Sequence, residues 1–384
     1  MTQAPPPDLK MQRTSRDAST VPALLEGWLA GLLPDGADPR VTLHSGIDAN
    51  GMSSETLVLD AAWAEDGRPR QGKYVARVAP SAADVPVFPS YDLQEQYDAI
   101  EHVGDHTDVP VPAVGFMEPT GEVLGTPFFL MDRIEGVVPP DVMPYTFGDN
   151  WLFDASREEQ QRLQDSSVGV LAGLHAIPDA VATFPYLDPG RHLTGSGVSG
   201  TPMERNLAAR RSWYEFAVPD LGRSPMVEKI LDWLEANQPA DPGDPGDTVL
   251  SWGDARIGNM MYRDFAPVAV LDWEMATIGS RALDVSWMVF SHQVFESIAT
   301  LFELPGMPHF MREEDVLATY EQLTGVRLGE LTWYHLYNAT AWCIVFMRTG
   351  ARQVRFGEIE KPDDVETLFH CKPLVERYLA EVGI

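Results

Sequence analysis

The stretch "SWGDARIGNMMYRDFAPVAVLDWE", residues 251–274, decides how the rest of the chain is interpreted. It begins with an acid, a guanidinium and an amide, Asp254, Arg256 and Asn259, set among small or apolar residues. Two strand-like runs follow on either side of the tight turn "DFAP", and this pattern predicts a β-hairpin. Because the two ends of a hairpin lie side by side, Asn259 and the Asp272 of "LDWE" are predicted to be neighbours.

These side chains match the needs of phosphoryl transfer: a base for a hydroxyl, oxygen ligands for magnesium, and cations for the phosphates. Asp254 and Asn259 have the D-x-x-x-x-N spacing of a kinase catalytic loop, and Asp272 starts a D-W-E after the hairpin, where a magnesium-holding aspartate belongs. Close carboxylates repel one another unless a cation lies between them, which favours a magnesium site. For each acid alone, capping of a turn explains the residue equally well; the ordered set favours an active site.

The chain resembles the aminoglycoside phosphotransferase and choline kinase-like family, small-molecule relatives of the protein kinases. The family's H-G-D-x-x-x-x-N loop corresponds to W-G-D-A-R-I-G-N here, its I-D-W-E to L-D-W-E, and its A-x-x-G-x-x-x-x-D-L-A run to "ATIGSRALDVSW". The resemblance extends from about residue 20 to 380. It implies Asp254 as catalytic base, Arg256 as a phosphate contact, Asn259 and Asp272 as Mg2+ ligands, Glu274 as a second acid beside the metal, and Asp284 as a brace for the loop.

Trp252 departs from this family, which usually has a histidine that braces the loop by hydrogen bonding. Tryptophan can brace by packing, and its indole N–H is a donor only. Two interpretations therefore stay open: an ATP- and magnesium-dependent kinase of a small-molecule hydroxyl, and a noncatalytic nucleotide-binding module of the same fold. A hydrolase is disfavoured, because the chain has no G-x-S-x-G elbow and no metal-ligand histidine pair.

The resemblance implies an α+β, two-lobed protein kinase-like fold, with a small antiparallel sheet and one key helix in the N-terminal lobe and a larger, mainly helical C-terminal lobe. The residue patterns agree, because short β-rich runs fill 41–135 and helical patterns follow. We expect a disordered tail over 1–16, a nucleotide-binding lobe with a leading helix over 17–135, and a lobe with the catalytic loop and acceptor pocket over 136–384. Helices are predicted near 90–103, 156–175, 203–217, 224–237, 282–303, 312–323, 330–350 and 363–381.

The loop "SGIDANGMSSET", residues 45–56, lies between strand candidates and offers glycine backbone, Ser53 and Ser54 to phosphates. It is not G-x-G-x-x-G, although the family often carries a looser loop at this place. A nucleotide clamp and an ordinary hairpin turn are both compatible with it.

Arg77 in "YVARVAP" stands where the kinase pattern has its lysine, and Glu95 in the following helix is the natural ion-pair partner. Arginine keeps the phosphate contact with a different geometry; the alternative is a solvated strand residue. "LMDRIEG" would be the hinge, where the backbone from Met131 to Arg133 could pair with adenine. Apolar strand packing explains the same run equally well.

Composition limits the partners. The chain has 384 residues with 28 basic and 57 acidic side chains, a formal charge of -29, so nucleic acid and anionic membranes are expected to be repelled. The two cysteines form no CxxC pattern and are expected to be packing residues, whereas His175, His292 and His335 lie on apolar helical patterns and are expected to be packed or surface histidines. The start lacks a signal-like stretch and no run of 18 apolar residues exists, which predicts a cytoplasmic protein supplied with ATP and Mg2+.

The expected acceptor is a hydroxyl group of a small molecule, and the C-terminal helices carry two sets of residues that bear on it. Aromatic residues could line a pocket, although at helical spacing they fit a core equally well: Trp213, Tyr214, Trp333, Tyr334, Tyr337 and Trp342. The negative charge of the whole chain would attract a cationic acceptor, but guanidinium groups in these helices suit an anionic acceptor at least as well. These groups belong to Arg210, Arg211, Arg348, Arg352 and Arg355. The sequence leaves the charge of the acceptor and the oligomeric state open.

Overall fold

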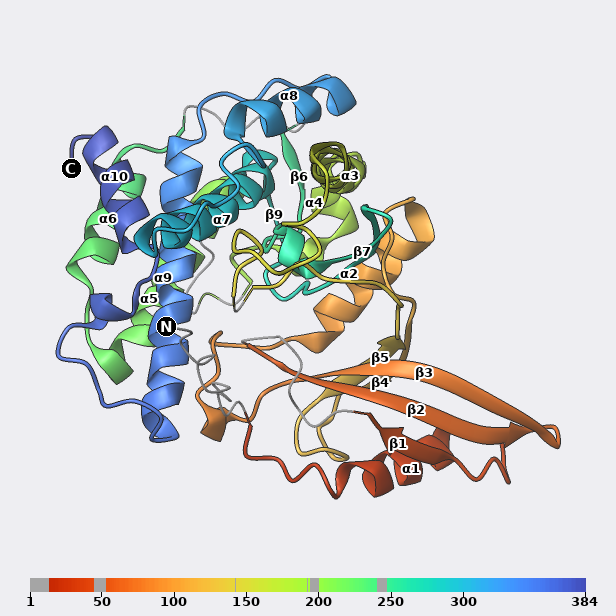
Figure 1. Cartoon of the computed structure of the whole chain (residues 1–384). Helices are drawn as coiled ribbons and strands as arrows, with labels where there is room; N and C mark the ends of the chain where they lie inside the picture. Colours follow the sequence, from red (N-terminus) through yellow and green to blue (C-terminus); the bar gives the residue numbers. More distant parts are fainter. Residues whose placement is uncertain (1–13, 45–52, 142, 192, 194–199, 240–246) are drawn as a thin grey trace, which may run out of the picture. The chain divides into compact units, whose positions relative to one another are not determined.

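The computed structural model describes residues 14–384 except 45–52, 142, 192, 194–199 and 240–246. Its contacts divide the chain into two compact units that each combine several segments (Figure 1). Unit 1 takes the described residues of Met1–Leu93, with Val114–Arg133 and Met347–Asp363; unit 2 takes those of Gln94–Ala113, Ile134–Phe346 and Asp364–Ile384. The expected domain boundary after residue 135 stays a prediction. Of the tail expected over 1–16, residues 1–13 lie outside the described residues.

A five-stranded antiparallel sheet with the order β1-β2-β3-β5-β4 forms the centre of unit 1. The strands are β1 (Arg40–Leu43), β2 (Glu55–Glu65), β3 (Arg68–Val78), β4 (Val114–Glu118) and β5 (Phe128–Asp132). β2 and β3 form a long hairpin whose turn residues, Asp66 and Gly67, both have positive φ, as a two-residue Asp-Gly turn requires. The predicted sheet is therefore present.

The leading helix α1 (Val21–Leu32) lies beside β1, as Figure 1 shows. Its buried residues Val21, Leu25 and Leu29 recur at helical spacing and join the inward side chains of the strands in one apolar core. Arg16 adds a polar tie, because its Nε lies 2.8 Å from a Glu55 carboxylate oxygen that is almost completely buried. The start of unit 1 is thus fastened to its sheet by an apolar face and by one shielded ion pair.

Unit 2 is mainly helical. Its helices, with two that continue into unit 1, are α2 (Leu93–His106), α3 (Arg157–Leu174), α4 (Ala180–Thr183), α5 (Pro202–Leu221), α6 (Pro225–Ala236), α7 (Ala282–Leu301), α8 (Glu313–Thr324), α9 (Thr332–Arg355) and α10 (Lys372–Glu381). Short 3-10 turns are η1 (Ala82–Asp84) in unit 1, and η2 (Pro185–Leu187), η3 (Ile257–Asn259) and η4 (Val365–Leu368) in unit 2. The α+β class is confirmed. The capping box predicted for α3 is also present, since Ser156 and Glu159 satisfy each other's backbone N–H groups.

One predicted helix is wrong as drawn. The segment 363–381 is not continuous: it holds η4, then an extended residue, Phe369, and only afterwards α10. Pro373 explains the break, because its ring lacks an N–H and would clash with the carbonyl four residues earlier. Proline is tolerated only in the first turn, which is where α10 places it.

Two small ladders in unit 2 carry the stretch 251–274. The predicted hairpin is confirmed as β7 (Met260–Arg263) and β8 (Ala266–Val270), joined by Asp264 and Phe265, which both have positive φ. A second ladder, β6 (Thr248–Ser251) with β9 (Thr277–Ser280), was not predicted. This ladder brings the two ends of the stretch 251–274 close together, because Ser251 at the start of the stretch pairs with Thr277 just after its end.

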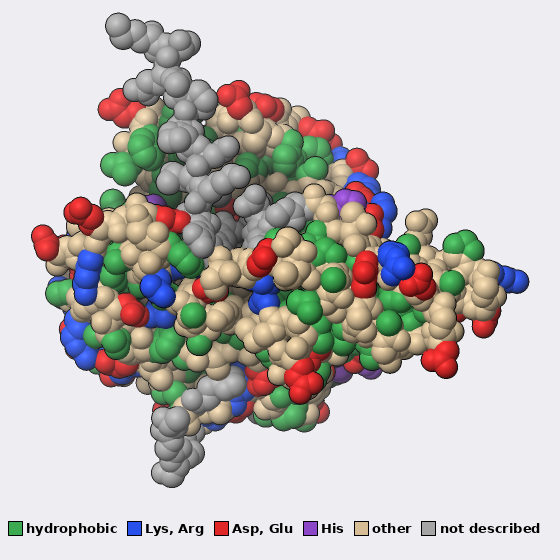
Figure 2. Space-filling model, turned by 90° about the horizontal axis from the view of Figure 1, so that it is seen from below, with side chains coloured by type: hydrophobic (Ala, Val, Ile, Leu, Met, Phe, Trp, Pro, Cys, Tyr) green, Lys and Arg blue, Asp and Glu red, His purple; other side chains and the backbone are tan. Residues whose placement is uncertain are grey.

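The surface carries side chains of both charges. On the face shown in Figure 2, acidic and basic side chains of the described residues are interspersed, and the basic ones do not merge into a broad patch. None of the helices in the described part of the chain combines the length and apolar character that crossing a membrane requires.

Candidate active site

The loop after β6 is anchored by one buried carboxylate, that of Asp284 in the first turn of α7. It accepts hydrogen bonds from the Ser251 hydroxyl at 2.7 Å and from the backbone N–H groups of Trp252 and Gly253 at 2.8 and 2.9 Å. His175 on α3 places its Nε2 3.1 Å from the same carboxylate. With four partners around it, Asp284 holds the loop at the position where the resemblance implies a brace.

Gly253 turns the chain directly before Asp254. Its φ is +88°, and a Cβ built there would lie less than 3.0 Å from the carbonyl oxygen of Met275. Only glycine meets both conditions without displacing the backbone. The loop can therefore approach the segment after "DWE" closely.

Trp252 is fully buried, and its indole N–H points to the other end of the stretch. The Nε1 lies 3.0 Å from the carbonyl oxygen of Leu271 and 3.2 Å from that of Asp272. Its ring also lies 6.3 Å from that of Trp273, centroid to centroid. The side chain thus braces the loop by hydrogen bonding as well as by packing.

Asp254 follows, with a side chain that is 14% exposed. Its Oδ1 accepts a hydrogen bond of 2.6 Å from the indole N–H of Trp287 on α7, and Arg256 Nε lies 3.1 Å from the same oxygen. Burial, reinforced by the neighbouring charge of Asp272, raises the pKa of Asp254, against the opposing effect of Arg256. A carboxylate with a raised pKa and a reachable oxygen is suited to accept a proton.

Arg256 lies between two carboxylates, because its guanidinium pairs with Asp141 as well as with Asp254. Burial opposes its charge, yet these two acids raise the pKa of Arg256 above its ordinary value. Gly258 leaves room for the pairing, since a Cβ there would meet both the Asp141 carboxylate and the Arg256 guanidinium. One oxygen of Asp141, Oδ1, is buried without a hydrogen-bond partner among the described residues.

The hairpin brings Asn259 next to the "DWE" segment. The Asn259 carbonyl accepts a hydrogen bond of 2.9 Å from the Leu271 N–H, and its Nδ2 donates to the Asp254 carbonyl at 3.1 Å. The amide oxygen of Asn259 is therefore the end left for a cation. Asp272 has a φ of +61°, an uncommon conformation for a residue other than glycine and one often found at functional sites.

A metal site made of protein carboxylates alone is not present in the described part of the chain. No three His, Cys, Asp or Glu side chains are grouped there closely enough to hold an ion. The residues with side-chain oxygens on the "DWE" side are Asn259, Asp272 and the partly buried Glu274, and their binding of one ion stays a prediction. Such a sparse set suits Mg2+, which keeps several waters and takes the remaining ligands from substrate phosphates.

Sequence reasoning missed three residues of this site. Trp287 contacts Asp254, Asp141 contacts Arg256, and His175 contacts Asp284. A signal existed for Trp287 alone, because it follows Asp284 by three residues and so lies on the same face of α7. His292 and His335 are buried, which is the packed one of the two alternatives; His175 is buried too, but it also belongs to the network that holds the loop.

The predicted phosphate loop lies mostly outside the described residues, which resume at Ser53 and Ser54. Both serines are buried, and the Ser53 carbonyl accepts a hydrogen bond of 3.0 Å from the Tyr91 hydroxyl. The Ser54 hydroxyl is buried with no hydrogen-bond partner among the described residues. Contact of either serine with a phosphate stays a prediction.

Arg77 lies on β3, opposite Thr56 of β2 and Phe129 of β5. Only 7% of this residue is exposed, so the alternative that it is a solvated strand residue is wrong. Buried arginines are costly unless their charge is compensated. Contact of Arg77 with a phosphate stays a prediction.

The predicted hinge residues occupy the end of β5 and the residue after it. Met131 is half-buried and pairs with Val75 in the sheet. Arg133 donates its backbone N–H to the Lys73 carbonyl at 3.0 Å, and its guanidinium lies 3.1 Å from Asp60. The Arg133 N–H is thus already used within unit 1, and pairing of this segment with adenine stays a prediction.

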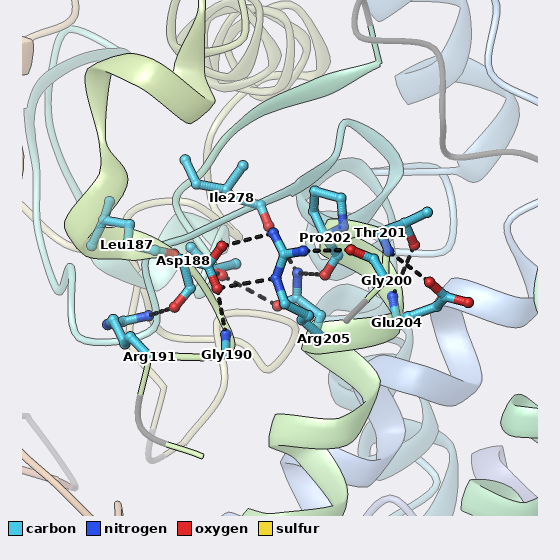
Figure 3. Close-up of polar contacts among 12 residues, drawn as sticks. Leu187, Asp188, Gly190, Arg191, Gly200, Thr201, Pro202, Glu204, Arg205 and Ile278 are labelled. Carbon is cyan, nitrogen blue, oxygen red and sulfur yellow. Dashed lines mark hydrogen bonds and ion pairs between the residues drawn. The ribbon is translucent and has the colours of Figure 1, made fainter. Parts of the chain in front are cut away.

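Glu95 has a partner inside unit 2, since Arg191 Nε lies 2.8 and 2.9 Å from its two carboxylate oxygens. Arg191 also donates to the Asp188 carbonyl, and the Asp188 carboxylate in turn accepts from Gly190 and from two nitrogens of Arg205 on α5, as Figure 3 shows. Through this chain of contacts the start of α2 is tied to α5. The predicted pairing of Glu95 with Arg77 stays untested.

The aromatic residues of the C-terminal helices are mostly core. Four of the six are buried: Trp213, Tyr214, Trp333 and Tyr337. Arg210 is buried with them, stacked 4.1 Å from the Tyr337 ring. In unit 1, Arg348 and Arg352 donate to backbone carbonyl oxygens of the segment 84–86. These three guanidiniums have structural roles, which weakens the case they made for an anionic acceptor.

Comparisons with known proteins bear on the fold and the family of the chain. A protein from Ralstonia eutropha assigned as an aminoglycoside phosphotransferase has the same fold, with a TM-score of 0.62 at 20% identity over 94% of this chain and 98% of that one. An aminoglycoside phosphotransferase solved with AMP-PNP and hygromycin B gives a TM-score of 0.51 at 16% identity over 94% of this chain and 99% of that one. These likenesses confirm the predicted kinase-like fold.

Curated relatives are larger proteins. Acyl-CoA dehydrogenase family member 10 of Mus musculus is 26% identical over 279 residues, which is 72% of this chain and 23% of that protein. The chain spans less than a third of the length of this relative and of two others with acyl-CoA dehydrogenase names. A model described as the phosphotransferase enzyme family matches residues 60–308. Since this match covers well over half of the chain, the protein belongs to the phosphotransferase enzyme family.

Proposed function

We propose that the chain transfers the γ-phosphate of ATP to a hydroxyl group of a small molecule, with Mg2+ as the metal. The observation that carries the proposal is the environment of Asp254: a largely buried carboxylate, oriented by Trp287 and Arg256, on a loop anchored by Asp284. Phosphoryl transfer asks mainly for such positioning and for charge stabilisation. Membership of the phosphotransferase family supports the reaction class.

Asp254 would act as the base in this reaction. The acceptor oxygen bonds to the γ-phosphorus while the bond from that phosphorus to the β–γ bridging oxygen breaks, and ADP leaves with the electron pair. The hydroxyl proton passes to Asp254, whose raised pKa brings its basicity closer to that of an effective catalyst at neutral pH. Arg256 would steady the phosphate once it exchanges part of its pairing with Asp141 for the substrate.

Asn259 and Asp272 would hold the magnesium ion, with Glu274 beside it. Magnesium, when bound, neutralises charge on the phosphates. The fit rests on the donor chemistry of these two residues. The Nδ2 of Asn259 is hydrogen-bonded to the Asp254 carbonyl, which orients the amide oxygen, and Asp272 supplies a carboxylate from a backbone position with positive φ. In unit 1, Ser53, Ser54 and Arg77 would contact phosphates and the segment from Met131 to Arg133 the adenine.

Replacement of Asp254 tests the role of the base. Asp254→Ala is expected to bind magnesium ATP with the affinity of the parent chain, measured by calorimetry, and to lose about 10²- to 10⁴-fold in turnover. Asp315→Asn is the control, because Asp315 in the first turn of α8 forms an exposed ion pair with Arg312, the residue before this helix. Full turnover by Asp254→Ala would remove Asp254 from the mechanism.

A noncatalytic nucleotide-binding module is the second candidate, and the observation behind it is Trp252 at the place of the family's histidine. The hydrogen bonds of Trp252 to Leu271 and Asp272 weaken this alternative, since the loop is braced without a histidine. Calorimetry with magnesium ATP, followed by a slow ATPase assay, separates the two candidates. Binding without any hydrolysis or transfer would support the module.

The relatives suggest more than one class of acceptor. The fold relative described above was solved with hygromycin B, and the larger curated relatives carry acyl-CoA dehydrogenase names. We therefore propose a screen with labelled ATP against aminoglycosides, choline-like amines, sugars and hydroxyacyl thioesters. Transfer to one class at a rate well above the ATPase background would identify it, and transfer to none would contradict the proposed phosphotransferase.

A further inference from the structure

Trp287 makes the shortest described hydrogen bond to the Asp254 carboxylate, 2.6 Å from indole Nε1 to Oδ1. Resting on the function proposed above, we propose that Trp287 is a positioning residue: it holds Oδ1 of Asp254 and thereby leaves Oδ2 to take the acceptor's proton. Trp287 itself would contact neither phosphate nor acceptor. Its contribution would be to select one oxygen and one orientation of the base.

The contacts of the carboxylate divide its two oxygens unequally. Oδ1 receives the Trp287 N–H and lies 3.1 Å from Arg256 Nε, whereas Oδ2 lies 3.3 Å from that same Nε and accepts no other hydrogen bond from the described residues. An ionised carboxylate offers about four lone-pair sites. The sites on Oδ2 are therefore the ones available for a hydroxyl.

Trp287 is well placed to hold this orientation. It is 4% exposed, and its ring lies 5.9 Å from that of Trp342 on α9. It also follows Asp284 by one turn of α7, so one rigid helix sets both the start of the loop and the direction of the base. An error of about 1 Å in the position of a catalytic group can cost roughly 10²-fold in rate.

The structure supplies a matched control in Trp342. Both tryptophans belong to the same aromatic cluster, but the Nε1 of Trp342 is buried with no hydrogen-bond partner among the described residues. Trp287→Phe and Trp342→Phe therefore remove similar rings from the same cluster. Only the first removes a donor to Asp254.

Kinetics with the full chain and magnesium ATP test the proposal, with ATP hydrolysis as the readout in the absence of a known acceptor. Trp287→Phe is expected to lower kcat about 10- to 100-fold while KM for magnesium ATP changes less than about 3-fold. Trp342→Phe is expected to leave both constants within about 3-fold of the parent values. Equal kcat values for the two variants would overturn the positioning role.

A second variant covers the case in which Trp287→Phe folds poorly. Site-specific replacement of Trp287 by benzothienylalanine keeps the size of the ring system and exchanges the N–H for sulfur. A fall in kcat like that of Trp287→Phe supports the proposal, and parent-like kcat overturns it.

Indole ¹⁵N–¹H spectra test the contact without turnover. The Nε1 resonance, assigned by its loss in Trp287→Phe, is expected to move further in Asp254→Asn than any other indole resonance, because a charged acceptor becomes neutral. An unmoved resonance would refute the contact. Absence of hydrolysis and transfer in the parent chain would instead overturn the proposed function, which this spectrum does not depend on.

Discussion

Trp252 donates its indole N–H to the carbonyl oxygen of Leu271 at 3.0 Å, and this contact joins the loop before the hairpin to the segment after it. The loop is therefore held in two ways. Its backbone N–H groups donate to the Asp284 carboxylate, and the Trp252 side chain donates to the segment after the hairpin. A histidine with the same task would be smaller and could donate from either ring nitrogen. Tryptophan in place of the family's histidine is the reason for considering a noncatalytic module. The same tryptophan nevertheless still braces the loop.

Trp252→Phe is expected to lower the free energy of unfolding by about 1–3 kcal/mol, because it removes the indole N–H that donates to the partly buried carbonyl oxygens of Leu271 and Asp272. Urea denaturation measures the difference. Trp342→Phe removes a similar ring whose N–H has no described partner, and it should cost clearly less. Equal losses for the two variants would show that packing alone explains Trp252.

Gly253→Ala is expected to destabilise the chain by about 3 kcal/mol or more and to abolish turnover, because the added Cβ meets the Met275 carbonyl at a left-handed position. Gly325→Ala is the matched control. Gly325 caps α8 with φ +73° and has nothing within 4 Å of a built Cβ, so only the backbone strain of about 1 kcal/mol should appear. Similar losses at both positions would mean that the close approach at Gly253 does not matter.

The elements near the active site were predictable where local patterns decide them. Two strand-like runs and the turn "DFAP" predicted the β7–β8 hairpin, and the Ser156–Glu159 spacing predicted the start of α3. Helical boundaries agreed within a few residues except where Pro373 interrupts the last segment. These features depend on neighbours in sequence, which is why one chain suffices to predict them.

The remaining features depend on contacts between distant residues. The β6–β9 ladder joins two four-residue strands too short to show a period. His175 reaches Asp284 across 109 positions, and Asp141 reaches Arg256 across 115. No local pattern marks such partners, so the sequence predicted the loop residues themselves and missed most of the side chains that hold them.

His292 makes the stability of the chain dependent on pH. Burial lowers the pKa of His292 to about 4 from an ordinary value of 6.5, and its Nδ1 faces the Tyr145 hydroxyl at 2.9 Å. Between these two pH values the unfolded chain binds the proton and the folded chain does not, so stability falls as pH falls from 6.5 towards 4. The total loss from this residue is about 3 kcal/mol.

Denaturation at several pH values, compared with His292→Gln, measures this contribution. The variant is expected to lose less stability than the parent between pH 6.5 and pH 4. Parallel curves for the parent and His292→Gln would contradict the buried neutral histidine.

Asp284→Asn tests the anchor of the loop. Asparagine keeps the shape, but one carboxylate oxygen becomes an NH2 group that faces donors, either the Ser251 and Gly253 side or the Trp252 and His175 side. Each hydrogen bond to a buried charged group contributes about 1.5–3 kcal/mol, so the loss should reach about 3–5 kcal/mol. Asp315→Asn, in an exposed ion pair, should cost less than about 1 kcal/mol. Asp284 is fully buried, and the hydrogen bonds named here join it only to the loop and to His175. A stable Asp284→Asn variant with the turnover of the parent chain would contradict the role of Asp284 as anchor. The loop would then be held by the Trp252 indole and the β6–β9 ladder alone.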